Sequence, residues 1–169
     1  VILLTESARF DPTIVARIKR QLQSGLTAVI TSGLLRALQD RGLRDIVEME
    51  TTDRKFSTDT FLMDWRSVYR SNQPIQVPHV RYYTNDSWEE ISCQAGVAGT
   101  PLLHAAQYGG GKLYVLVIPD NPGDLYRLPR EVLSRINRAL SSGLPVRLDA
   151  PSQVSLFIYD NNHLVVESF

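Results

Sequence analysis

Three consecutive glycines, Gly109–Gly111, and the apolar segment after them constrain the fold more than any other feature of this chain. Glycine adopts backbone conformations that other residues avoid, so the three predict a tight reversal. Residues 113–118 are apolar without alternation, which is typical of a strand buried on both faces. We therefore predict a hairpin with strands at residues 102–107 and 112–118. Because a strand rather than a helix follows the glycines, they do not form a phosphate-binding loop.

Length and charge narrow the classes of function. The 169 residues suit a single domain that buries a core without disulfides or metals. With 18 basic and 18 acidic residues, no net charge attracts nucleic acid or an anionic membrane. The apolar runs are too short for a membrane-spanning helix. The single cysteine, Cys93, excludes an internal disulfide and a multi-cysteine metal site, but it does not indicate a compartment. We expect no cofactor, no nucleic-acid partner and no membrane partner.

The first fifty residues alternate between strand-like and helix-like segments. Strands are expected at residues 1–5, 27–31 and 45–49. The helices between them begin after Asp11 and at Ser32, and the first carries Ile14, Ile18 and Leu22 on one face. Short strand–helix–strand connections of this kind predict a parallel sheet with right-handed crossovers.

The rest of the chain is less regular. Residues 51–60 are polar and expected to form a loop, and Pro74 and Pro78 bracket an expected turn. A helix is expected from Pro129 to just before Gly143. Strands are expected at residues 61–65, 79–83, 88–93, 146–148, 154–159 and 164–166, the last two joined by a polar turn at residues 160–163.

These segments predict an α/β fold with a three-layer parallel sheet and antiparallel strands added toward the C-terminus. Residues 1–169 are expected to form one domain, with residues 146–169 as a β appendage. Because strand-like runs include both Val1 and Phe169, we expect a domain excised from a longer chain.

Two motifs carry a resemblance to a known family. The strand–turn–helix at Thr27–Leu38 and the Tyr-Gly-x-Gly-Lys hairpin at residues 108–112 resemble class I glutamine amidotransferase-like domains, which are flavodoxin-like. The likeness is to non-catalytic variants beside glycosidase barrels, such as the trimerisation domain of some bacterial β-galactosidases. In those modules a segment similar to residues 154–161 leads toward a C-terminal sandwich. The resemblance implies an accessory module of a bacterial, carbohydrate-active protein, which contacts other domains of its parent or further copies of itself.

The chain departs from the catalytic members of that family at both expected positions. A cysteine is expected at the turn after a central strand, but Ile30–Leu34 contains none. A His-x-Glu pair is expected after a late strand, but Ile118 is followed by Pro119, Asp120 and Asn121. The resemblance therefore implies the scaffold without glutamine hydrolysis.

One edge of the predicted sheet gathers polar residues. If the strands run parallel, their carboxyl ends bring together Glu6, Ser32, Asp120 and Asn121, where open α/β sheets bind ligands. The aromatic side chains of Trp65, Tyr69 and Trp88 would add surface on which sugars stack. The alternative function is thus a hydrolase or a small-molecule or glycan site at this edge. The competing interpretation is that the edge packs against a neighbouring domain.

The remaining candidates have structural explanations. Ser32 lacks the flanking glycines of a nucleophile elbow and is expected to cap the helix of residues 33–41. Cys93 lies in a strand-like run without basic neighbours, so we expect a buried thiol rather than a nucleophile paired with His79 or His104. His163 is expected in an exposed turn, and three dispersed histidines have no metal-site spacing. The remaining carboxylates considered for glycosidase chemistry, none of which forms a distinctive pair, are Asp64, Glu89, Glu90 and Asp124.

Overall fold

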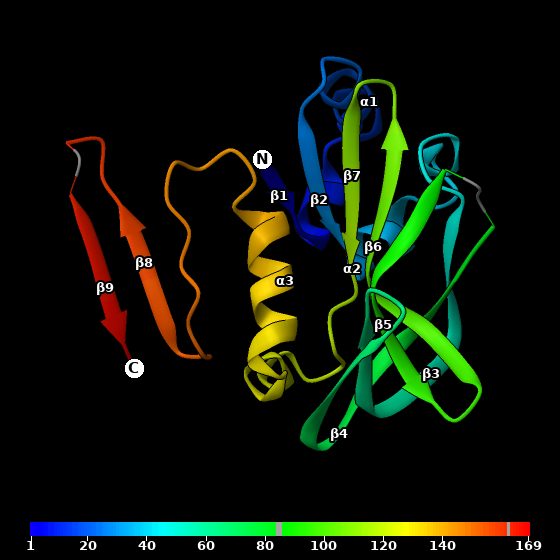
Figure 1. The fold of residues 1–169 in the computed structure, drawn as a ribbon. Helices are drawn as coiled ribbons and strands as arrows, with labels where there is room; N and C mark the ends of the chain where they lie inside the picture. The colour runs from blue at the N-terminus through cyan, green and yellow to red at the C-terminus, as the bar shows by residue number, and fades with distance from the viewer. Residues whose placement is uncertain (84–85, 162) are drawn as a thin grey trace.

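A seven-stranded mixed sheet and a separate two-stranded sheet make up the computed structural model, which describes residues 1–83, 86–161 and 163–169 (Figure 1). The large sheet has the strand order β1-β2-β7-β6-β5-β3-β4. Its strands are β1 (Ile2–Leu4), β2 (Thr27–Thr31), β3 (Met49–Met63), β4 (Ser67–Tyr82), β5 (Ser87–Ala95), β6 (Ala98–Tyr108) and β7 (Gly111–Leu116); the small sheet is β8 (Val154–Ile158) with β9 (Leu164–Ser168). The α-helices are α1 (Ile14–Gln23), α2 (Ser32–Leu38) and α3 (Arg130–Leu140), and the 3-10 helices are η1 (Glu6–Phe10), η2 (Leu43–Asp45) and η3 (Pro122–Arg127).

Among the described residues, the parallel pairs are β1 with β2 and β2 with β7, and Ile30 lies opposite Val115 in the second pair. The predicted strand at residues 45–49 is wrong, because η2 and a short connection occupy this segment and β3 begins at Met49. Its apolar residues Ile46 and Val47 are buried without joining a strand. Apolar runs indicate burial and do not by themselves distinguish a strand from a connection.

The other half of the sheet is antiparallel and is built on the long β3–β4 hairpin. The predicted loop at residues 51–60 is wrong, since these residues belong to β3. The turn predicted between Pro74 and Pro78 is also wrong, because both prolines lie within β4. β4 is an edge strand, which tolerates residues without a backbone N–H. The hairpin turns instead at Asp64 and Trp65, both with positive φ.

The glycine hairpin between β6 and β7 is confirmed, and it also sets the position of α1. A Cβ atom on Gly111 would lie 2.5 Å from the carbonyl oxygen of Leu22 in α1 and closer still to that of Leu26. The prediction that the strand after the glycines is buried on both faces holds only at the end of β7, where Val115 and Leu116 are both buried. Earlier in β7, Lys112 and Tyr114 are half-buried, so one face is partly exposed.

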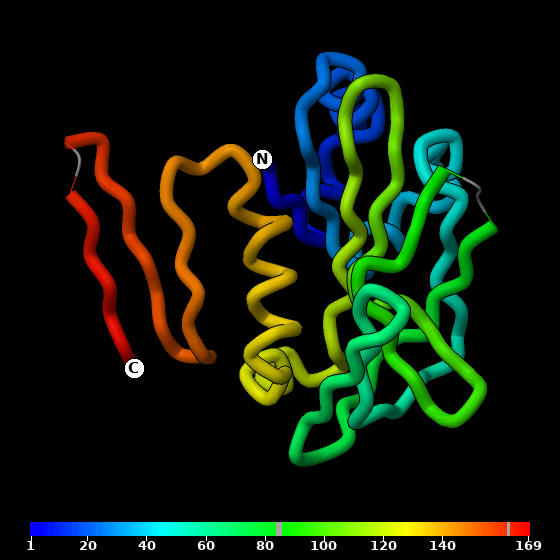
Figure 2. The backbone as a smooth tube through the Cα atoms, in the orientation of Figure 1, coloured from blue at the N-terminus to red at the C-terminus, as the bar shows by residue number. Residues whose placement is uncertain are grey.

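Helix α3 is confirmed and lies between the large sheet and the β8–β9 hairpin (Figure 2). Arg135 joins it to the sheet, donating to Glu90 of β5 at 2.7 Å and to both carboxylate oxygens of Asp64 at 2.9 and 2.7 Å. The predicted β8–β9 pair is confirmed, although residue 162 of its turn lies outside the described residues. Residues 146–148 form no strand but belong to the connection from α3 to β8.

The prediction of an α/β fold is therefore confirmed. The antiparallel strands expected toward the C-terminus lie mainly in the middle of the chain, in β3 to β6, so the large sheet is mixed and is not the three-layer parallel sheet of a flavodoxin-like domain. The largest fully buried side chains belong to one core: Leu22, Ile30, Leu34, Leu35, Leu38, Leu43, Met49, Phe61, Ile75, Ile91, Leu102 and Leu103. Among the described residues, no helix combines the length and the apolarity needed to cross a bilayer.

Candidate functional site

Strands β1 and β2 are parallel neighbours, so their carboxyl ends lie at the same edge of the sheet, and Glu6 follows β1 in η1. A Cβ atom on Gly33 would come within 2.9 Å of Oε2 of Glu6, so this carboxylate lies directly against the start of α2. The same carboxylate pairs with Arg9 in η1. The side chain therefore connects η1 to α2.

Ser32 connects α2 to the segment that follows β7. Its hydroxyl accepts a hydrogen bond from the backbone N–H of Ile118 at 3.1 Å, and the residue is buried. The prediction that Ser32 caps the helix is wrong, because Thr31 is the N-cap and accepts from the N–H of Leu34 at 3.5 Å. The Ser32 hydroxyl satisfies a backbone donor just beyond the end of β7, which is a structural role.

Asp120 and Asn121 point to other parts of the fold. Asp120 pairs with Lys55 of β3 at 2.6 Å. Asn121 is the N-cap of η3, where its side-chain oxygen accepts from Gly123 N–H at 3.1 Å. The structure thus brings Glu6 close to Gly33 and Ser32 close to Ile118, and it pairs Asp120 and Asn121 with residues outside the predicted site.

The aromatic residues proposed to extend this edge lie in the antiparallel half of the sheet. Trp65 is 80% exposed at the β3–β4 turn, and Tyr69 belongs to β4. Trp88 of β5 donates to Glu90 at 2.9 Å, and the Lys112 ammonium lies 4.8 Å from its ring.

Cys93 is a buried thiol, as expected, and its burial raises its pKa. Burial lowers the pKa of His104 to about 4, and Nε2 of this ring lies 2.5 Å from the Ser87 hydroxyl. His79 also has a lowered pKa, first because of burial and then because of nearby arginines. A raised thiol pKa opposes formation of the nucleophilic thiolate.

The acidic residues considered for glycosidase chemistry each contact another side chain in the structure. Asp64 and Glu90 share Arg135, a partner that the sequence did not identify because helical arginines are usually solvated. Burial raises the pKa of Glu89, and a hydrogen bond with Tyr82 opposes that shift. Within residues 1–83, 86–161 and 163–169, no group of three or more His, Cys, Asp or Glu could hold a metal ion.

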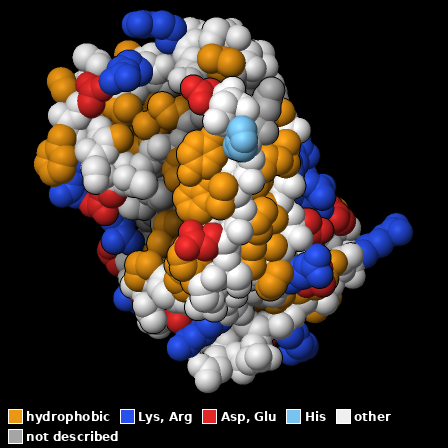
Figure 3. All heavy atoms as spheres, turned by 90° about the vertical axis from the view of Figure 1, so that its left-hand side faces the viewer, with side chains coloured by type: hydrophobic (Ala, Val, Ile, Leu, Met, Phe, Trp, Pro, Cys, Tyr) orange, Lys and Arg blue, Asp and Glu red, His pale blue; other side chains and the backbone are white. Residues whose placement is uncertain are grey.

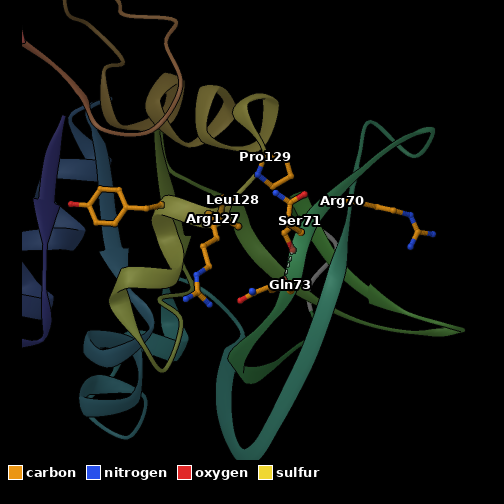
Figure 4. A pocket seen from close by; sticks show the side chains of 8 residues that line it. Arg70, Ser71, Gln73, Arg127, Leu128 and Pro129 are labelled. Atoms are coloured by element: carbon orange, nitrogen blue, oxygen red, sulfur yellow. Dashed lines mark hydrogen bonds between the residues drawn. The ribbon is translucent and has the colours of Figure 1, made fainter. Parts of the chain in front are cut away.

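A cavity of about 550 Å³ lies between β4 and η3, and we name it the β4–η3 cavity (Figure 4). Its lining residues are Arg70, Ser71, Asn72, Gln73, Tyr126, Arg127, Leu128 and Pro129. The register of β3 and β4 shifts here, and residues 71–74 lie opposite Asp59 alone. The sequence analysis missed this site, although the polar run Ser71–Gln73 before Pro74 was a signal of irregular backbone.

The β8–β9 hairpin and the residues at its ends carry a group of exposed apolar side chains, which we name the hairpin surface. Figure 3 shows hydrophobic side chains gathered in a band on this side of the molecule. The members of the hairpin surface are between 38% and 71% exposed: Phe157, Ile158, Tyr159, Leu164, Val165, Val166 and Phe169. Both faces of the hairpin contribute, since Phe157 pairs with Val165 on one face and Ile158 with Leu164 on the other.

One comparison with known proteins gives a match at this hairpin. Residues 145–169 match the model of a family described as probable glycosyl hydrolase, C-terminal domain. The matched segment includes the whole of the hairpin surface. It covers a small part of the chain. No curated protein matches the chain.

Two solved β-galactosidases share the fold. The enzyme from Bacillus circulans sp. alkalophilus is similar over 91% of this chain and 23% of its own length, with 15% identity and a TM-score of 0.52. The enzyme from Rahnella sp. R3 is similar over 91% of this chain and 24% of its own length, with 17% identity and a TM-score of 0.52. The chain thus spans about a quarter of the length of these enzymes, and neither of them is an amidotransferase.

Proposed function

We propose that this chain is a non-catalytic accessory module of a larger glycoside hydrolase, in which it holds other domains or other subunits in place. The observation that carries the proposal is the hairpin surface within residues 145–169, the segment matched by a glycosyl hydrolase C-terminal domain model. Exposed apolar patches of this kind mark sites of association.

The energetics of the hairpin support this proposal. An isolated two-stranded sheet is at best marginally stable in water. Each half-exposed side chain of the hairpin surface would contribute about 1 kcal/mol if it were covered. In the parent protein, we propose that further strands after residue 169 cover this surface and extend the pair into a β-sandwich.

The finer role is assembly, of the type found in the trimerisation modules of bacterial β-galactosidases. The glycine hairpin resembles those modules in sequence, and the two β-galactosidases share the fold. The lack of a catalytic cysteine within Ile30–Leu34 and the partners found for Glu6 and Ser32 fit a scaffold rather than a hydrolase.

Amide hydrogen exchange tests the proposal by comparing this chain with its parent protein. We expect the β9 amides to exchange fast in residues 1–169 alone and at least about tenfold more slowly in the parent, because covering strands protect them. The amides of β2, buried in the core, provide the internal control. Equal exchange of β9 in both proteins would contradict the proposal.

An activity assay separates the proposal from the alternative site at the carboxyl edge. We expect residues 1–169 alone to release no product from nitrophenyl glycosides. Turnover or glycan binding that disappears in Asp120→Ala or Glu6→Gln would favour the alternative and refute the accessory role.

A further inference from the structure

We propose that the β4–η3 cavity binds a neutral saccharide of one or two rings. The inference deepens the proposed function and rests on it for the choice of sugar. The volume of about 550 Å³ falls in the range of small-molecule sites. None of its lining residues belongs to the candidate set Glu6, Ser32, Asp120 and Asn121 or to the hairpin surface.

The β4 side of the cavity offers free amide groups. In the described part of the chain, the side chains of Asn72 and Gln73 are exposed and make no hydrogen bond. Each amide supplies two donors and an acceptor, which matches sugar hydroxyls that both donate and accept. Ser71 is buried and donates to the carbonyl of Gln73 at 2.7 Å, so the bulge that presents these amides is held by its own hydrogen bond.

The η3 side supplies a polar group and an apolar wall. Figure 4 shows Gln73 and Arg127 pointing toward one another across the cavity, while Arg70 points away from it. Pro129 is half-buried and supplies most of the apolar surface at the end of η3, because Leu128 beside it is only 4% exposed. The C–H face of a sugar ring can pack on such a wall while its hydroxyls reach the amides.

The charges select a neutral ligand over an anion. The guanidinium of Arg127 pairs with Asp124 at 3.1 Å, and that carboxylate is largely buried. Arg70 lies 3.7 Å from Asp59. Because each arginine has a carboxylate beside it, a bound phosphate or uronate would have to compete with Asp124 or Asp59.

Saccharide titrations followed by NMR test the inference on the full chain of residues 1–169. The probes are methyl β-galactoside and lactose, with galacturonate and inorganic phosphate as anionic counterparts. We expect the two neutral sugars to shift the amide signals of residues 70–73 and 126–129, and the two anions to leave them unchanged.

Variants of the lining residues test which side chains contact the sugar. We expect Gln73→Ala and Asn72→Ala each to weaken the affinity for lactose about tenfold. Gln76→Ala is the matched control, because Gln76 is an exposed glutamine of the same strand outside the cavity. We also expect Asp124→Asn to gain galacturonate binding, since it frees Arg127.

Three results would overturn the inference: no shifts at saturating sugar, stronger binding of phosphate or galacturonate than of lactose, or lactose shifts that persist unchanged in Gln73→Ala. Its failure is distinguishable from failure of the proposed function. Slow exchange of β9 in the parent protein would leave the accessory role standing without a sugar site, whereas equal exchange would refute that role whatever the titration shows.

Discussion

Gly111 is the position at which a single added methyl group should most damage this fold. A Cβ atom built on Gly111 would lie 2.5 Å from the carbonyl oxygen of Leu22, whereas ordinary van der Waals contact begins at 3.4 Å. Both nearby oxygens are backbone atoms, so neither can rotate away. In Gly111→Ala, the C-terminal end of α1 and β7 must therefore separate by roughly 1 Å.

The magnitude follows from what that movement disrupts. Leu22 is fully buried at this end of α1, and its contacts with the sheet loosen when the helix shifts. Forcing extra atoms into a packed site costs about 1 to 3 kcal/mol. We expect the upper end of this range, because the obstruction is backbone.

Gly110→Ala is the matched control in the same turn. Its Cβ site meets only Gly25, at 3.5 Å, and its φ is not in the left-handed region. Alanine there should be neutral or stabilise by up to about 1 kcal/mol, because it restricts the unfolded chain.

Urea unfolding followed by circular dichroism measures the difference. We expect Gly111→Ala to be less stable than Gly110→Ala by about 3 kcal/mol, or about 6 to 12 °C in Tm. The reasoning is refuted if the two variants unfold within about 0.5 kcal/mol of one another.

Three further predictions concern polar contacts within the fold. Arg135→Ala should lower the free energy of unfolding by about 1 to 2 kcal/mol, mainly because the largely buried Glu90 carboxylate loses its partner, whereas Asp64 is exposed; urea unfolding checks this, and a loss below about 0.5 kcal/mol contradicts it. His104 has a folded pKa of about 4, below the 6.5 of the unfolded chain, so its neutral form stabilises the fold above pH 6.5 and up to about 3 kcal/mol is lost as the pH falls toward 4. Unfolding measured from pH 7 to 4 should show a steeper loss in the native chain than in His104→Leu, and equal slopes would disprove the assignment. Ser32→Ala should cost about 1 to 2 kcal/mol by leaving the N–H of Ile118 unpaired, and it should speed exchange of that amide; unchanged exchange would mean that the hydroxyl is dispensable.

The predicted edge site shows how far a topological argument reaches. Sequence periodicity placed strands before Glu6 and Ser32, and these strands are parallel neighbours in the structure. That was enough to predict that Glu6 and Ser32 lie at the same edge. It did not predict that Asp120 pairs with Lys55, because β3 was expected to be a loop at that point.

The antiparallel half was harder to predict for a physical reason. Residues 51–60 of β3 carry many polar side chains because the strand pairs with an edge strand, so their pattern resembles that of a loop. Prolines such as Pro74 and Pro78 usually indicate turns, but a strand with a free edge accommodates them. The signals used were local, and edge position is a property of the whole sheet.

The sequence by itself determined the elements whose signals lie within a few residues: the glycine hairpin, the amphipathic helices α1 and α3, and the β8–β9 pair. Helical periodicity, glycine conformation and turn residues act locally, so they can be read without knowing what packs against them. Only the tertiary structure decided which strand lies beside β2, which carboxylates Arg135 joins, and that Gly111 must be glycine so that α1 can approach. Those outcomes depend on contacts between segments far apart in the chain, where close packing, rather than local preference, selects the arrangement.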